Sequence, residues 1–250
     1  MRRRAAALLR GGRLALHLAG GMLQAIPYPH LPPDRQRRML QSWSRRLLAI
    51  LDIGVLAEGQ PPARDGNACL IVANHVSWLD IFVLNAVLPA RFVAKSEVRG
   101  WPLVGWLCRR TGTIFVDRAL RRHAAAVNRD VACLLIRGHC VSLFPEGTSS
   151  DGRRVGHFHS ALIQSAINAG TALVPVALRY RHEDGGHCDA PAYVGDMTLS
   201  GSIWRVLRSR RFDASLSFAP ALATAGESRR SLARAAQQAI ARELGHADAA

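Results

Sequence analysis

A histidine and an aspartate that could share a proton lie five residues apart. His75 and Asp80 belong to the stretch NHVSWLD (residues 74–80), which directly follows an apolar run. A carboxylate that keeps one ring nitrogen protonated leaves the other free to take a proton from an alcohol. Residues five apart sit roughly 140° round a helix, so the pair meets if His75 precedes the helix and Asp80 lies in its first turn. The alternative is a plain helix start, capped by Asn74 or Ser77, with Asp80 favoured by the helix dipole.

Two further motifs place polar groups where predicted strands end. GTIFVDR (residues 112–118) predicts a strand that ends at Asp117 and Arg118. Ligands of open α/β sheets bind at the carboxyl ends of strands, and a guanidinium there suits a phosphate. The alternative is a surface Arg118 paired with Asp117.

In LFPEGTSS (residues 143–150), Gly147 permits a close backbone approach, and the following hydroxyls can donate to oxygens. The alternative there is an ordinary strand-to-loop turn.

A fourth motif, VPV (residues 174–176), places a proline inside an apolar strand. Proline cannot donate to a strand ladder, so Pro175 predicts an edge strand or a bulge near the site.

Together the four motifs strongly resemble the glycerolipid acyltransferases, and above all the bacterial 1-acyl-sn-glycerol-3-phosphate acyltransferases. NHxSxxD, GxxFxDR, FPEGTS and VPV follow one another in this order, and AKSEV at 94–98 also looks like that family. The resemblance covers about residues 68–180. It implies that His75 is the general base, that Asp80 orients it, and that Arg118, Glu146 and Gly147 hold the acceptor lipid.

The chemistry that follows is direct acyl transfer. The base deprotonates the free hydroxyl of a lyso-lipid, and the alkoxide attacks an acyl thioester, whose thiol leaves. We count Thr148 and Ser149 among the acceptor-binding residues. Backbone N–H groups near the His75 turn, or Lys95, are the candidate donors to the oxyanion. The reaction needs no cofactor and no metal; acyl carrier protein or acyl-CoA is the co-substrate.

Two departures from the family pattern bear on the acceptor. Ser149 stands where many relatives have arginine, and His159 occupies the lysine position of a common FKxG motif. FPEGTSSDG followed by HSAL resembles the branch that acylates lyso-ornithine lipid, whose acceptor has no phosphate. The retained Arg118 favours 1-acyl-sn-glycerol-3-phosphate, which we take as the leading acceptor, with lyso-ornithine lipid as the alternative.

The net charge of +15, from 33 Lys and Arg against 18 Asp and Glu, predicts an anionic partner. An anionic membrane surface and an acidic carrier protein fit. Nucleic acid does not, because no zinc finger, RNA-binding signature or helix-turn-helix is visible. Five cysteines without a CxxC favour a reducing compartment, and no spacing indicates a metal site. A catalytically silent lipid- or carrier-binding protein is the alternative of another class, which the intact His75, Asp80, Arg118 and Glu146 oppose.

The N-terminal region predicts two amphipathic helices rich in leucine and arginine, the second from about 34 to 56. We expect them to lie in the headgroup region of the membrane; the alternative is a helical hairpin packed on the domain. The best apolar stretch, 14–26, is too short to span a bilayer. The protein is therefore expected at the cytoplasmic face of the inner membrane, as a peripheral or monotopic protein.

Strands and helices alternate after residue 68. Five apolar runs predict buried strands at 69–73, 91–94, 113–116, 141–144 and 172–178, with helices between them. Residues 213–218 alternate with period two, as in a half-exposed strand, and 228–244 predict a last helix. The chain is thus expected to form an α/β sandwich with a mixed, largely parallel sheet. We divide it into a helical membrane-binding segment, 1–62, and an acyltransferase domain, 63–246.

Overall fold

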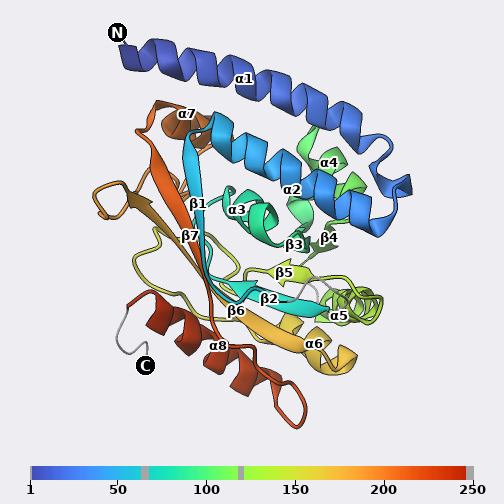
Figure 1. The fold of residues 1–250 in the computed structure, drawn as a ribbon. Helices are drawn as coiled ribbons and strands as arrows, with labels where there is room; N and C mark the ends of the chain where they lie inside the picture. The colour runs from blue at the N-terminus through green and yellow to red at the C-terminus, as the bar shows by residue number, and fades with distance from the viewer. Residues whose placement is uncertain (1, 63–67, 118–120, 246–250) are drawn as a thin grey trace.

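One mixed sheet organises the computed structural model, which describes residues 2–62, 68–117 and 121–245 (Figure 1). Its described strands follow the order β1-β7-β6-β2-β5-β3-β4. Every neighbouring pair is parallel except β6 and β7, which are antiparallel. The α/β fold class predicted from the sequence is therefore confirmed. The strand bounds are β1 Ile53–Gly59, β2 Cys69–Ala73, β3 Arg91–Lys95, β4 Ile114–Val116, β5 Val141–Leu143, β6 Ala172–His182 and β7 Phe212–Phe218.

The predicted strands form where their apolar runs meet helices on both faces of the sheet. All five residues of β2 are buried, as expected of a central parallel strand with a continuous apolar sequence. The alternating segment forms β7, in which every second residue is buried. In both strands, the hydrophobic pattern of the sequence predicts which side chains the layers of the sandwich cover.

The helices form two layers, one on each face of the sheet (Figure 1). The first layer contains α1 Arg2–Ala25, α2 Pro33–Ile50, α3 Asp80–Val87 and α7 Leu199–Arg208. The second contains α5 Arg121–Ile136, α6 Gln164–Ala169 and α8 Arg229–Glu243. The remaining helices are α4 Val104–Arg110 and the short 3-10 helices η1 Tyr28–His30, η2 Ser96–Gly100 and η3 Ala161–Ile163. Each face of the sheet thus has its own apolar core.

The two N-terminal helices pack on the first face. α2 lies against α3, and α1 lies against both α2 and α7 (Figure 1). The second helix is shorter than the sequence suggested, because it ends at Ile50 and the chain turns at Asp52, whose φ is 61°. Residues 53–59 then enter the sheet as β1. The division between residues 62 and 63 stays a prediction, since 63–67 lie outside the described residues.

The packing of the N-terminal helices leaves part of α1 uncovered. Within the described residues, none of the helices is both long enough and apolar enough to cross a bilayer. The outer surface of α1 nevertheless exposes Leu8, Leu9, Leu16 and Leu23 to between 66% and 76%.

The prediction that Pro175 marks an edge or a bulge was wrong. β6 is a central strand between β2 and β7, and Pro175 pairs in regular register with Val72. Its carbonyl accepts a hydrogen bond from Ala219 N at 3.1 Å, so its backbone polar groups face the β7 side. The antiparallel register with β7 begins one residue later, at Val176. Pro175 therefore lies just outside the β6–β7 ladder, and its lack of a backbone N–H removes no hydrogen bond from that ladder.

The topology brings two of the motifs together. β2 and β5 are parallel neighbours, so residues 74–80 and 144–150 emerge at the same edge of the sheet. β4, which carries the second motif, is separated from β5 by β3. Arg118 itself lies outside the described residues.

Candidate active site

His75 and Asp80 form a hydrogen-bonded pair at the carboxyl edge of the sheet. His75 follows β2, and Asp80 is the first residue of α3. Nδ1 of His75 lies 2.8 Å from Oδ2 of Asp80. Both positions agree with the turn and first helical turn expected from their spacing. Since a carboxylate on Nδ1 fixes the proton there, Nε2 is the nitrogen that can accept another proton.

Asp80 is completely buried, and four donors surround it. Oδ2 also accepts from the backbone N–H groups of Val76 at 2.7 Å and Ser77 at 2.9 Å. Oδ1 accepts from the hydroxyl of Tyr180 at 2.6 Å. A buried carboxylate requires such partners, because its desolvation is otherwise costly. These bonds fix the carboxylate, and the carboxylate in turn fixes the imidazole.

Sequence reasoning did not find Tyr180. It lies in β6, beside Asp80 in space but 100 residues later in the chain. Burial and the neighbouring carboxylate raise the pKa of Tyr180 well above its ordinary value, so the phenol stays a donor. The available signal was the period-two pattern of β6, which places Val176, Leu178 and Tyr180 on the same buried face. Nothing in that pattern indicates which residue the hydroxyl contacts.

The third motif holds the backbone of His75. Oε1 of Glu146 accepts from His75 N at 3.1 Å. The carbonyl of His75 accepts from both the N–H and the hydroxyl of Ser150, at 2.8 and 3.1 Å. Phe144 stacks on the imidazole with ring centroids 4.1 Å apart and nearly parallel planes. The His75 side chain remains 21% exposed, so the imidazole is accessible from solvent.

Glu146 is a nearly buried carboxyl group. Desolvation raises its pKa to about 7, while hydrogen bonds from the backbone of His75 and Gly156 act in the opposite direction. Gly156 is required for this approach, because a Cβ there would lie 2.8 Å from Oε2. Glu146 therefore titrates near neutral pH directly beside the His75 backbone.

The other predicted binding residues have varied surroundings. Gly147 adopts a φ of 78°, which suits glycine, and its N–H donates to Phe144 O at 3.1 Å. Thr148 is exposed. The hydroxyl of Ser149 donates to the carbonyl of Tyr193. Lys95 is exposed at the carboxyl end of β3. Ser149 thus ties the motif to the 183–198 segment, a contact that the sequence did not indicate.

The helix-start interpretation is correct only for Asp80, which lies in the first turn of α3. Ser77 does not cap that helix: its Oγ accepts from Leu79 N at 3.3 Å, but Leu79 is itself the N-cap residue and the helix start has no side-chain cap. Asn74 is no cap: its side chain exchanges two hydrogen bonds with the backbone of Leu178, at 2.9 and 2.7 Å. It therefore fixes the end of β2 against β6, next to His75.

The backbone N–H groups of the His75 turn are poor candidates for an oxyanion site. Those of residues 75, 76 and 77 all donate to the carboxylates of Glu146 or Asp80. Lys95 thus remains the one sequence-based candidate. For metals, the described residues contain no group of three His, Cys, Asp or Glu side chains able to hold an ion.

Comparison with known proteins shows which family this chain is similar to. A family model described as Acyltransferase matches residues 54–179. A 1-acyl-sn-glycerol-3-phosphate acyltransferase of Neisseria meningitidis is 41% identical over 186 residues, covering 74% of this chain and 72% of that protein. A lyso-ornithine lipid O-acyltransferase of Pseudomonas aeruginosa is 38% identical over 239 residues, covering 95% and 90%.

The fold has a counterpart among solved structures. The crystal structure of a 1-acyl-sn-glycerophosphate acyltransferase from Thermotoga maritima superposes with a TM-score of 0.69 at 21% identity, covering 98% of this chain and 95% of that one. At that identity the likeness concerns the fold alone. The family match and the extended similarity to curated enzymes show that this chain is an acyltransferase and belongs to the 1-acyl-sn-glycerol-3-phosphate acyltransferase family of glycerolipid acyltransferases.

Proposed function

We propose that His75 is the general base of this acyltransferase and that Asp80 orients it. The observation that supports this most is the 2.8 Å contact between Nδ1 and Asp80, whose carboxylate accepts three further hydrogen bonds. Nε2 takes the proton of the lyso-lipid hydroxyl, and the oxygen attacks the thioester carbonyl. When the tetrahedral intermediate collapses, the C–S bond breaks and the thiolate receives that proton. No acyl-enzyme forms, and no cofactor takes part.

Lys95 is the proposed donor to the oxyanion, and Glu146, Gly147, Thr148, Ser149 and Arg118 are the proposed acceptor-binding residues. Lys95 is the last residue of β3, which is a parallel neighbour of β5 in the sheet. Lys95 and His75 therefore lie at the same edge of the sheet. A donor aimed at the developing charge contributes roughly 2.7–4 kcal/mol. Glu146 already accepts a hydrogen bond from His75 N, and Ser149 already donates one to the carbonyl of Tyr193. In this proposal both residues fix the conformation of the 144–150 loop as well as contact the acceptor.

The proposed donor is acyl carrier protein or acyl-CoA, and the proposed location is the cytoplasmic face of the inner membrane. Both donors are anionic, which suits a net charge of +15. The exposed leucines of α1 support peripheral contact with lipid.

The leading acceptor is 1-acyl-sn-glycerol-3-phosphate, as the sequence motifs suggest. Lyso-ornithine lipid is the second candidate, and two observations favour it. The relative named for that acceptor aligns with 95% of this chain, against 74% for the Neisseria relative. In addition, Ser149 stands where many relatives have an arginine that can bind phosphate, and the Ser149 hydroxyl donates to the carbonyl of Tyr193.

The test of the mechanism is an acyl-transfer assay on purified His75→Ala. We expect the rate to fall by about 10²–10⁴, which is the usual contribution of a general base. His30→Ala removes an exposed histidine of η1 and serves as the matched control, with unchanged turnover expected. Turnover near the wild-type rate in folded His75→Ala would reject the proposed base. Offering both acceptors with each donor in the same assay identifies the preferred pair.

A further inference from the structure

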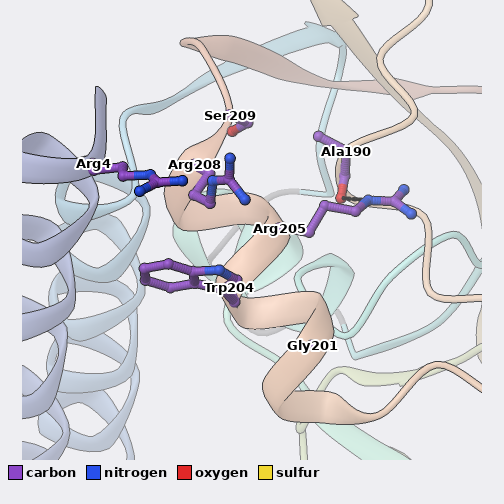
Figure 2. Close-up of a pocket in the computed structure, with 7 residues that line it drawn as sticks. All are labelled: Arg4, Ala190, Gly201, Trp204, Arg205, Arg208 and Ser209. Atoms are coloured by element: carbon purple, nitrogen blue, oxygen red, sulfur yellow. Dashed lines mark hydrogen bonds between the residues drawn. The ribbon is translucent and has the colours of Figure 1, made fainter. Parts of the chain in front are cut away.

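A small basic cavity lies between the first and seventh helices, apart from the candidate active site. It has a volume of about 440 Å³, and its lining includes Arg4 of α1 and Trp204, Arg205 and Arg208 of α7. Figure 2 shows Arg4 reaching from α1 toward Arg208, with the Trp204 ring beside them. Arg205 points the other way, and its Nε donates to the carbonyl of Ala190 at 2.9 Å. The cavity thus presents two converging guanidinium groups beside an indole.

Within the described part of the chain, no carboxylate neutralises these two guanidinium groups. Among the residues that the structure describes, neither Arg4 nor Arg208 has an Asp or Glu oxygen within 4.0 Å, and no acidic residue lines the cavity. Arg10, further along α1, differs: it pairs with Asp52 at 2.6 Å and also donates to Ser209 O. Two like charges that converge without a counter-charge favour an anion between them.

The size and setting of the cavity indicate the kind of anion. The cavity opens to solvent, and a volume of about 440 Å³ is large enough for a phosphoryl headgroup. On α1, Leu8 and Leu9 follow Arg4 by about one turn and are 66% and 67% exposed. Trp204 is 43% exposed, and tryptophan commonly sits at headgroup level. Apolar and basic groups side by side match an amphiphile better than a soluble anion.

We propose that the α1–α7 cavity binds the phosphoryl headgroup of an anionic membrane lipid. This inference rests on the proposed membrane location and names the group that the protein recognises there. The opposite side of α7 reaches the catalytic motif, because Trp78 Nε1 donates to Ser202 Oγ at 3.0 Å. A headgroup held at Arg4 and Arg208 therefore sets the orientation of the His75 edge relative to the bilayer surface.

The test compares two double variants with equal changes in charge. Arg4→Gln/Arg208→Gln removes the cavity pair. Arg229→Gln/Arg230→Gln removes two exposed arginines from α8, which covers the other face of the sheet (Figure 1). Binding is measured by co-sedimentation with vesicles of phosphatidylcholine alone or mixed with phosphatidylglycerol. One basic residue at an anionic surface is worth about 1 kcal/mol, or roughly fivefold in binding. We expect the cavity pair to lose at least about tenfold on phosphatidylglycerol vesicles, and the α8 pair less than about threefold.

Each other outcome overturns the inference. Equal losses for the two double variants would mean diffuse attraction, and equal binding to both vesicle types would mean that no headgroup charge is recognised. Binding of three soluble ligands, inorganic phosphate, coenzyme A and acyl carrier protein, is measured in parallel. If the Arg4→Gln/Arg208→Gln substitution weakens binding of any of these as strongly as it weakens binding of the vesicles, the occupant is not a lipid. Trp204→Phe is a check that leaves the charge unchanged. The change in tryptophan fluorescence that phosphatidylglycerol vesicles cause in the wild-type protein must be smaller in that variant.

Failure of this inference is distinguishable from failure of the proposed function. In detergent micelles, the cavity variant should retain acyl transfer, because neither arginine contacts the His75 pair. Conversely, His75→Ala should bind vesicles like the wild-type protein. Loss of micellar turnover in the folded cavity variant would overturn the assignment of these arginines to a separate lipid site.

Discussion

At the scale of single residues, the geometry around His75 depends on how Asp80 is held. The carboxylate is buried, and its bonds to Val76 N, Ser77 N and Tyr180 all orient it toward the imidazole. Three of its four partners come from the local segment 75–80, and the spacing of the motif predicted one of them, His75. Tyr180 is the exception, because it arrives from a distant strand.

Tyr180→Phe tests this distant contact. The change removes one hydrogen bond to a buried charged group, so we expect the free energy of unfolding to fall by about 1.5–3 kcal/mol. A carboxylate with one donor fewer holds the proton of the pair more tightly. The acid limb of the pH profile of kcat/KM should therefore move to higher pH.

Tyr28→Phe is the control, because it also removes a buried phenol but lies in η1, away from the pair. Its pH profile should match that of the wild-type protein. A Tyr180→Phe profile that also matches would show that the hydroxyl does not influence proton transfer.

The raised pKa of Glu146 predicts that the stability of the protein depends on pH. Its pKa of about 7 in the folded protein exceeds the ordinary 4.5, so the folded state keeps a proton that the unfolded state releases between these values. Stability therefore falls as pH rises through that window, by up to about 3 kcal/mol at 1.36 kcal/mol per unit. Glu146→Gln does not titrate and should lack this loss. Urea unfolding of both proteins at about pH 5 and about pH 8 measures it; parallel changes in the two proteins would contradict the buried-carboxyl explanation.

At the scale of elements, the crossing of α1 and α2 depends on one glycine. A Cβ at Gly21 would lie 2.5 Å from Trp43 Nε1, so α1 approaches the indole closely there. The Trp43 ring stacks on His17, with centroids 4.6 Å apart, and meets Phe82 of α3 at 5.5 Å. Phe82 in turn meets Trp78 of the NHVSWLD motif at 6.0 Å. Aromatic rings thus connect the N-terminal helix to the loop that carries His75 and Asp80.

Gly20 and Gly21 form a matched pair for testing that crossing. An added methyl group at Gly20 meets nothing within 4 Å, so Gly20→Ala should stabilise the protein by about 0.5–1 kcal/mol through helix propensity. Gly21→Ala gains the same propensity but overpacks against Trp43, which typically costs about 1–3 kcal/mol. We expect it to be net destabilising in urea unfolding. Equal stability of the two variants would show that α1 does not press on Trp43.

At the scale of the whole molecule, the sandwich separates two kinds of surface. The face covered by α1, α2, α3 and α7 carries the exposed leucines of α1 and the cavity at Arg208. The face covered by α5, α6 and α8 encloses the second apolar core. The net charge of +15 is a property of composition and predicts an anionic partner, but it does not locate one. The cavity between α1 and α7 is the location that we propose.

The sequence by itself determined the fold class, most strands and the His75–Asp80 pair. Strand patterns and the five-residue spacing are local, and local geometry depends little on the rest of the chain. It also predicted that residues 74–80 and 144–150 each follow a buried strand, and the pairing of β2 with β5 brings the two segments to one edge.

Only the tertiary structure decided which distant groups complete the site. Tyr180 reaches Asp80, Asn74 holds Leu178, and Ser149 holds Tyr193 because β6 and the 183–198 segment pack beside β2. The central place of Pro175 likewise depends on where β7 ends. Arg4 and Arg208 lie more than two hundred residues apart in the chain and meet in one cavity. Such contacts join segments far apart in sequence, and no local period or spacing encodes the long-range packing that brings them together.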